Sequence, residues 1–339
     1  MIVSVGATMV PGYAHRPGNH CGSTALRNLL AFHGVELSEE MALGLGAGAC
    51  LYFIPMDGQS PSRFLNGRTS RLEEQFVELT GAPLQLRTFG SPEESWAAAR
   101  AAVEGGSPAL LLTDLYYLDH YGKSAHFPGH AVVLAGFDDE LSYLSDTAFG
   151  ELQTTALDNL AMARHSDHPV FPLAGHMFVA GEGVADFDPG AAAPAAIAAG
   201  AGRMLEPPLG DFEGLPALRR FAAEVEGWPE LLEDWRWTAR FSYQVIERRG
   251  TGGGNFRRMY SRFLAECADR GFAAVPAAHV ELASEAAAAW TRLAHGLQAA
   301  REEEAAQPQR WAAIGVDARS VCALEERLWT GLADGFREA

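Results

Sequence analysis

The sequence has few cysteines, and they lie far apart. Four occur among 339 residues, at positions 21, 50, 267 and 322, and no two of them form a CxxC pair. This pattern excludes the dense disulfide framework of small secreted domains. The first residues, Met-Ile-Val-Ser-Val-Gly-Ala, also lack the basic region and the long apolar stretch of a signal peptide. We therefore expect a cytoplasmic protein with free thiols.

Long apolar runs and positive charge are scarce as well. No uninterrupted apolar run reaches the roughly 18 residues that span a bilayer, so we expect no membrane partner and no integral membrane protein. Lysine and arginine number 26 against 43 aspartates and glutamates, which gives a formal charge of −17. A phosphate backbone would be repelled at long range, so nucleic acid is not an expected partner.

The length predicts about two domains. Residues 188–202 consist mostly of alanine, glycine and proline. That composition predicts a linker between a first domain over residues 1–187 and a second over residues 203–339. The alternative is a short alanine-rich helix packed on the first domain, because alanine has a high helix propensity.

Hydrophobic periodicity indicates a different fold class on each side of this break. Before it, predicted helices precede predicted strands, which is typical of an α+β domain with an antiparallel sheet. The helices cover residues 21–33, 71–79 and 93–104, and the strands cover 108–115, 131–137 and 141–145. After it, the pattern is mainly helical, over residues 215–225, 231–246, 256–270, 280–301 and 319–336.

Cys21 stands at the start of the first predicted helix. Unpaired N–H groups and the helix dipole at such a position lower the pKa of a thiol and favour the thiolate, which is the nucleophilic form. The position therefore suits a catalytic cysteine. The alternative is a small buried residue, since free cysteine is commonly just packed.

His130 and Asp146 flank two strands joined by a turn near Asp138. Such a turn pairs residues whose numbers add to about 276, which places His130 opposite Asp146 and roughly 5 Å away on the same face of the sheet. A carboxylate there could orient the imidazole as a catalytic base. A slip of one residue would point the two side chains apart, and they would then merely begin and end strands.

The order Cys21, His130, Asp146 is the order that papain-like thiol enzymes use. His15 lies six residues before the cysteine, where such folds often place a glutamine that helps to bind the oxyanion. An imidazole N–H could do the same. The alternative is an exposed loop histidine.

Several segments together resemble a known family. They are His20–Gly34, Leu43–Gly46, Asp114–Leu118, His126 and His130–Asp138. The first part of the chain, over roughly residues 12–180, resembles the N-terminal domain of the butirosin biosynthesis protein H family. The segment Gly252–Glu266 resembles the uncharacterised helical domain that often follows it.

This resemblance implies a papain-like thiol fold, related in outline to the bacteriocin-processing peptidases. The named member of the family transfers an aminoacyl group from an acyl carrier protein to an aminoglycoside amine. The resemblance assigns Cys21 as nucleophile, His130 as base and Asp146 as orienting residue, with His126 as a rival base. It implies no bound cofactor, a phosphopantetheine-linked or small acyl thioester as donor, and a small-molecule amine as acceptor.

Other interpretations stay open at this point. The same triad could serve a cysteine hydrolase acting on peptide, amide or thioester bonds, or the fold could be a non-catalytic binding or scaffold protein. Three arginines, Arg257, Arg258 and Arg262, could bind a phosphopantetheine or the acidic surface of a carrier, or form a solvated helix face. A zinc site is not expected, because the Pro-Gly between His126 and His130 breaks the helix that such a pair of ligands would need.

Overall fold

A computed structural model describes residues 6–169 and 171–337. The chain forms two units, one of Met1–Ala42 with Glu73–Asp188 and one of Leu43–Leu72 with Pro189–Ala339. Residues 43–72, predicted to belong to the first domain, are therefore part of the second unit. The reason is long-range packing, because these residues fold into a hairpin whose strands contact helices of residues 193–247.

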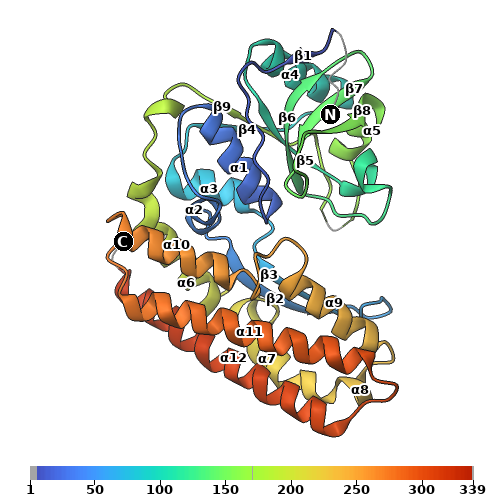
Figure 1. Ribbon diagram of the computed structural model, residues 1–339, viewed down its shortest axis with the longest axis vertical. Helices are drawn as coiled ribbons and strands as arrows, with labels where there is room; N and C mark the ends of the chain where they lie inside the picture. The colour runs from blue at the N-terminus through green and yellow to red at the C-terminus, as the bar shows by residue number, and fades with distance from the viewer. Residues whose placement is uncertain (1–5, 170, 338–339) are drawn as a thin grey trace. The chain divides into compact units, whose positions relative to one another are not determined.

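An antiparallel sheet forms the centre of the first unit (Figure 1). Its strands follow the path β4–β9–β5–β6–β7–β8, and β1 pairs with β6. Their bounds are β1 Thr8–Met9, β4 Leu84–Arg87, β5 Ala109–Thr113, β6 His130–Phe137, β7 Leu141–Ser145, β8 Gln153–Ala156 and β9 Met177–Ala180. All residues of β5 and β6 are buried, as their continuous apolar sequences require.

The helices before residue 188 include α1, α4 and α5, which pack against this sheet. Their bounds are α1 Cys21–Phe32, α2 Glu39–Leu45, α3 Leu72–Thr80, α4 Pro92–Glu104 and α5 Leu157–Arg164, with short 3-10 helices η1 Leu115–Tyr117, η2 Asp119–Tyr121 and η3 Val184–Asp186. α1 contacts β5 and β6, whereas α4 and α5 contact each other and the sheet. Val103 of α4 and Leu160 of α5 share one core with Val132 and Leu134 of β6.

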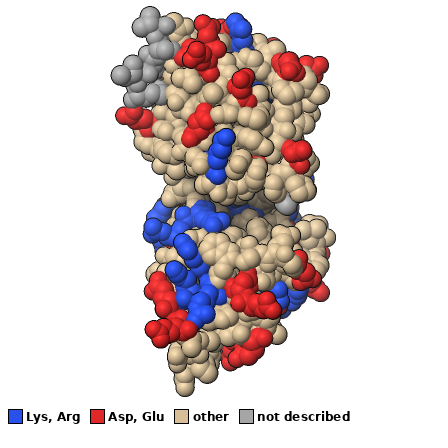
Figure 2. All heavy atoms as spheres, turned by 90° about the vertical axis from the view of Figure 1, so that its right-hand side faces the viewer, with Lys and Arg blue, Asp and Glu red and all other residues tan. Residues whose placement is uncertain are grey.

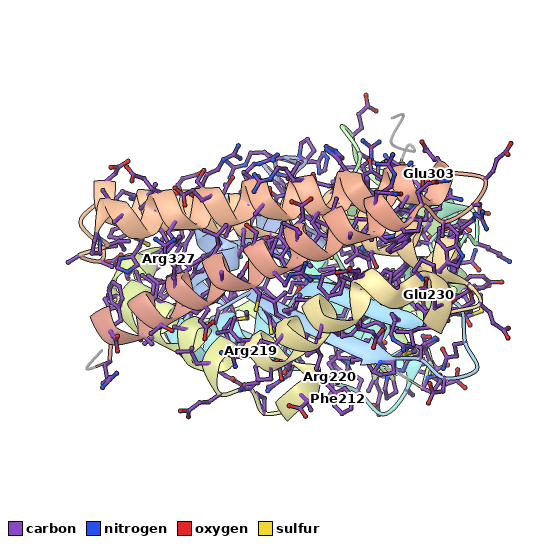
Figure 3. All side chains as sticks on the ribbon, turned by 90° about the horizontal axis from the view of Figure 1, so that it is seen from below. Phe212, Arg219, Arg220, Glu230, Glu303 and Arg327 are labelled. Atoms are coloured by element: carbon purple, nitrogen blue, oxygen red, sulfur yellow. The ribbon has the colours of Figure 1, made fainter. Side chains whose placement is uncertain are left out.

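The second unit is mainly helical and includes the hairpin of β2 Ala49–Pro55 and β3 Arg63–Arg68. Its helices are α6 Ala193–Leu205, α7 Gly214–Glu224, α8 Trp228–Leu231, α9 Trp235–Glu247, α10 Arg257–Asp269, α11 Ala277–Glu302 and α12 Pro308–Gly335, with η4 Pro189–Ala192, η5 Gly210–Phe212 and η6 Val225–Gly227. α11 and α12 lie side by side, and Glu303 marks the turn between them (Figure 3). Buried tryptophans, including Trp228, Trp290 and Trp329, fill the space between the helices.

The segment 188–202 is not a linker. It contains η4 and most of α6, whose residues Ala196, Ile197 and Ala201 are buried. α6 packs on α7, α12 and β2, all of the second unit, so the alternative of a helix on the first domain is wrong as well. Alanine-rich sequence forms a helix here because small side chains allow close packing against several neighbours. The predicted class, an α+β region with an antiparallel sheet followed by a helical region, is confirmed.

Across residues 6–169 and 171–337, no helix combines the length and the apolar character needed to cross a membrane.

Candidate active site

Cys21 is the first residue of α1, and its free thiol is half-buried. His20 caps the helix: its backbone is extended and its ring accepts a hydrogen bond from the N–H of Ser23 at 3.3 Å. The cap uses one of the first-turn N–H groups, none of which has a partner within a helix. The thiol therefore lies at the positive end of the helix dipole.

The backbone before Cys21 is held by Glu39, a residue that sequence reasoning missed. Its carboxylate accepts the N–H groups of His20 at 2.6 Å and Asn19 at 2.9 Å, and the hydroxyl of Thr24 at 3.0 Å. Glu39 is only 5% exposed, so these charge-assisted bonds are shielded from water. Donors and acceptor lie 15 to 20 residues apart along the chain, so no short sequence motif predicts these hydrogen bonds.

His130 begins β6, Asp146 follows β7, and their side chains meet. Nε2 of His130 donates to Oδ2 of Asp146 at 2.9 Å, and both side chains are buried. Because Nε2 is engaged, Nδ1 is the ring nitrogen left for a second partner. His130 also forms a hydrogen bond with Cys21. The fold thus brings the three residues of the predicted triad together.

The strand register that joins His130 to Asp146 differs from the predicted one. Partner numbers add to 279 at Gly136 and, beyond a β-bulge, to 278 at Val133. Asp146 is therefore displaced by two residues from the position opposite His130. A displacement of two residues keeps both side chains on one face of the sheet as diagonal neighbours. Had the register at Gly136 continued to His130, the displacement would have been three residues and the side chains would lie on opposite faces.

Burial and charge act in opposite directions on this pair. Burial lowers the pKa of His130, but the charge of Asp146, its hydrogen bond and the contact with Cys21 outweigh burial and raise the pKa to about 10. Burial raises the pKa of Asp146, but His130 and the hydrogen bond from His120 hold it well below its usual range. Each partner favours the charged form of the other, so the pair is an imidazolium and a carboxylate.

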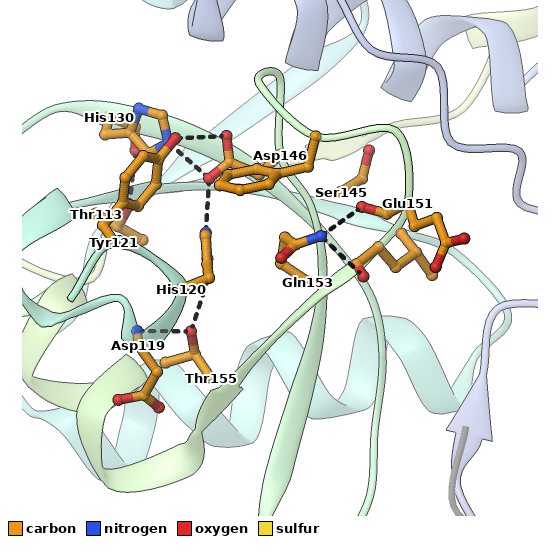
Figure 4. A network of polar contacts seen from close by, with 12 residues as sticks. Thr113, Asp119, His120, Tyr121, His130, Ser145, Asp146, Glu151, Gln153 and Thr155 are labelled. Carbon is orange, nitrogen blue, oxygen red and sulfur yellow. Dashed lines mark hydrogen bonds and ion pairs between the residues drawn. The ribbon is translucent and has the colours of Figure 1, made fainter. Parts of the chain in front are cut away.

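Two further side chains hold Asp146, and the sequence analysis missed both roles (Figure 4). Nε2 of His120 donates to Oδ2 at 2.9 Å, and the hydroxyl of Tyr121 donates to Oδ1 at 3.2 Å. Both residues lie on η2, directly after the segment Asp114–Leu118. Their proximity to that segment is the signal that could have found them.

His15 is not available as an oxyanion donor, contrary to the prediction. Its Nε2 contacts the carbonyl oxygen of Phe149 at 2.8 Å, and its Nδ1 contacts the hydroxyl of Ser145 at 2.7 Å. A carbonyl can only accept, so Nε2 carries the proton and Nδ1 accepts from Ser145. No ring N–H is left to face a substrate.

His126, the rival base, belongs to a separate pair. Its Nδ1 donates to Oδ2 of Asp114 at 2.7 Å, and its ring stacks on Tyr116 with centroids 4.1 Å apart. Asp114 is fully buried, whereas the side chain of His126 is 40% exposed. The carboxylate that orients His126 is therefore not the one that orients His130.

Arg257 cannot bind a substrate, because it is fully buried in the second unit. Its guanidinium forms a bidentate pair with Glu325, at 2.7 and 3.0 Å, and donates to the carbonyl of Cys50 at 2.7 Å. The sequence placed it on a helix face, but that face is the one packed inward. Arg258 and Arg262 are exposed, and their role in binding stays a prediction.

Three histidines of the first unit serve different partners. His120 and His130 bond to Asp146, and His126 bonds to Asp114. Among the residues whose placement is described, no three His, Cys, Asp or Glu side chains are arranged to hold a metal ion.

Comparison with known proteins identifies two sequence regions. Residues 20–147 match the family model "Butirosin biosynthesis protein H, N-terminal", and residues 158–332 match "Domain of unknown function (DUF4872)". The second match begins within α5 of the first unit. No curated protein matches the chain.

Among solved structures, the chain is similar to a protein from Bacillus anthracis described as a C39-like peptidase. The two are 15% identical, with a TM-score of 0.37, and the alignment covers 52% of this chain and 98% of the other. The butirosin biosynthesis protein H domain, with a thiol at a helix start beside a histidine and a carboxylate, indicates a papain-like cysteine enzyme.

Proposed function

The chain belongs to the DUF4872 family and carries a butirosin biosynthesis protein H N-terminal domain, and we propose that it is a cysteine acyltransferase. In this proposal an acyl or aminoacyl group moves from a thioester to an amine in specialised-metabolite biosynthesis, through an acyl-enzyme on Cys21. One observation carries the proposal: the thiol of Cys21 contacts an imidazole, His130, that a buried carboxylate orients.

In the first step the Cys21 thiolate attacks the thioester carbonyl. The new carbon–sulfur bond forms as the carbonyl oxygen becomes an oxyanion. Because the ring of His15 is fully engaged, we assign the oxyanion to main-chain N–H groups in the first turn of α1. The tetrahedral intermediate then collapses, the donor thiolate leaves, and it takes a proton from the His130 imidazolium.

In the second step an amine attacks the acyl-enzyme. His130, now neutral, removes a proton from the attacking nitrogen through Nδ1, while Nε2 keeps its bond to Asp146. The amide is released, and Cys21 leaves as thiolate beside a protonated His130, which restores the starting state. If water reached the acyl-enzyme first, the same residues would act as a hydrolase.

The second unit offers a surface for an acidic carrier of the thioester. Arg240 of α9, and Arg248 and Arg249 just beyond its end, are exposed, and we call them the arginine face. None of them forms an ion pair with a carboxylate in the part of the chain that the structure describes. Burial and the charge of Arg240 lower the pKa of Arg249, so the positive charges repel one another and favour an anion.

Figure 2 shows blue side chains gathered on one face of the helical unit, while red ones are scattered over the rest of the visible surface. Local positive charge in a chain of net charge −17 supports docking of an acidic acyl carrier protein through the arginine face.

Intact mass after incubation with simple acyl thioesters tests the proposal. We expect wild type to gain one acyl group, Cys21→Ala to gain none, and Cys322→Ala, which removes another half-buried thiol, to behave as wild type. Added amines should discharge the adduct as amides faster than water does. If Cys21 forms no adduct and ignores iodoacetamide, the proposal fails and a binding or scaffold role replaces it; discharge by water alone would make the protein a hydrolase.

A further inference from the structure

One carboxylate oxygen accepts hydrogen bonds from two imidazoles. Oδ2 of Asp146 lies 2.9 Å from Nε2 of His130 and 2.9 Å from Nε2 of His120. Its other oxygen accepts from Tyr121. His130 also bonds to Cys21, so a change at Asp146 reaches the thiol through His130.

The partners assign the protons. An ionised carboxylate only accepts, so Nε2 carries a proton on both rings. Nδ1 of His120 lies 3.4 Å from the hydroxyl of Thr155, which itself accepts the N–H of Asp119 at 3.3 Å. His120 is therefore a hydrogen-bond donor to Asp146 through Nε2.

The position of His120 is fixed by the strand beside it. Asp119, its neighbour in η2, accepts the N–H of Ala156 at 2.8 Å and a hydrogen bond from Asn159 at 2.6 Å, which ties η2 to β8 and α5 (Figure 4 shows Asp119, His120 and Thr155). The ring of Phe149 packs edge-on against His120 at 5.1 Å. The side chain of His120 is 6% exposed, so water does not replace it as a donor.

We propose that His120 is a positioning residue that limits how strongly Asp146 stabilises the protonated form of His130, by donating to the same carboxylate oxygen. This rests on the proposed function, in which His130 must both keep its proton beside the thiolate and release it to the leaving thiol. A carboxylate that accepts another hydrogen bond is a weaker base toward each partner. His120 thereby brings the imidazolium closer to the acidity that proton transfer needs.

The groups that face this carboxylate are few. From β6 there is His130, from η2 there are His120 and Tyr121, and Cys21 of α1 bonds to His130 and acts on Tyr121 through its charge. The carboxylate of Asp119 turns away toward Ala156 and Asn159. A change in the titration of His130 on substitution of His120 therefore reports on the shared oxygen.

Nuclear magnetic resonance titration of histidine-labelled full-length protein tests this without requiring turnover. In His120→Phe, which keeps a ring beside Phe149 but cannot donate, we expect the pKa of His130 to rise by about one pH unit. His120→Gln places an amide N–H near the former Nε2 and should leave the pKa close to that of wild type. His120→Asn is polar but too short to reach Oδ2, so it should resemble His120→Phe and replaces it if that variant does not fold.

The alkaline limit of acyl transfer should move upward with the pKa of His130 in the same variants. An unchanged or lowered pKa in His120→Phe and His120→Asn overturns the proposal, as does an equal rise in His120→Gln. If wild type forms no acyl-enzyme, the proposed function fails while the titration still decides the role of His120.

Discussion

Asp146 is the residue on which the charge of the site depends. It is fully buried, yet it stays ionised because three side chains donate to it. In return it keeps His130 protonated, although burial alone would remove that proton. The two shifts therefore have one cause, the hydrogen-bonded ion pair, and one substitution removes both.

Asp146→Asn should lower stability in a pH window set by these two groups. The raised pKa of His130 contributes stability in full below its ordinary value of 6.5, and that contribution is lost as pH rises through about 10. The lowered pKa of Asp146 contributes above its ordinary value of 3.8 and is lost as pH falls. Urea unfolding should therefore show the largest loss from Asp146→Asn between these ordinary values, and a smaller loss as the solution becomes alkaline.

The matched control for this window is His126→Gln. His126 bonds to Asp114 and helps to lower the pKa of that carboxyl, so its replacement should change stability only on the acid side and should leave the decline at alkaline pH as in wild type. The same variant should retain acyl transfer, whereas His130→Gln should abolish it. Equal loss of transfer in both would contradict the assignment of His130 as the base.

The junction between the loop before Cys21 and α1 is the element that aims the nucleophile. Helix α1 supplies the dipole, but a helix N-terminus is also where the chain frays most easily. Glu39 of α2 prevents this by accepting donors from both sides of the junction. Residues of two consecutive helices, 15 to 20 positions apart, thus fix one thiol.

Glu39→Gln should weaken this junction. An amide has one acceptor oxygen, and its NH2 group would face the N–H donors of Asn19 and His20. We expect a loss of about 1.5–3 kcal/mol in the free energy of unfolding, together with slower acylation of Cys21. Glu36→Gln is the control: this glutamate forms an exposed ion pair with Arg16, and its replacement should cost less than about 1 kcal/mol.

At the scale of the whole molecule, the second unit places arginines both in its core and on its surface. In the second unit the buried Arg257 joins α10 to α12 through Glu325, to which the indoles of Trp290 and Trp329 also donate. The arginine face lies on the same unit but outside its core. The buried arginine therefore stabilises the fold, whereas the exposed arginines are available to bind a partner.

Arg257→Met should leave the carboxylate of Glu325 buried without its cation. Breaking such a pair costs about 3–5 kcal/mol. Arg258→Met removes an exposed neighbour on the same helix and should change stability by less than about 0.5 kcal/mol. Thermal and urea unfolding of the two variants should separate clearly; similar stabilities would contradict the structural role of Arg257.

Reversal of charge on the arginine face should weaken acyl transfer only from thioester donors that are attached to a carrier protein. The double variant Arg240→Glu, Arg249→Glu should raise KM for an acyl carrier protein thioester roughly tenfold or more, with a weaker dependence on salt. Its activity with the same acyl group on free pantetheine should match wild type. Arg270→Glu, an exposed arginine paired with Glu266, is the control. Parallel loss with both donors would remove the arginine face as a docking surface.

The sequence by itself determined the local features. A cysteine at a helix start, buried strands at Ala109–Thr113 and His130–Phe137, and a helical second half follow from periodicity and capping, which depend on near neighbours. The pairing of His130 with Asp146 was also predicted, although through the wrong register. The prediction of the pair was still correct, because the predicted register was wrong by two residues. Side chains alternate between the two faces of a strand, so a shift of two keeps both on the same face.

Only the tertiary structure decided which polar groups are engaged. Glu39 and His120 hold the site through contacts that span 15 or more residues, and His15 is occupied by Ser145 and Phe149. The burial of Arg257, and the place of residues 43–72 and of α6 in the second unit, likewise depend on packing between distant segments. A bulge, a shared carboxylate and an inward helix face arise from long-range packing, which no short stretch of sequence encodes.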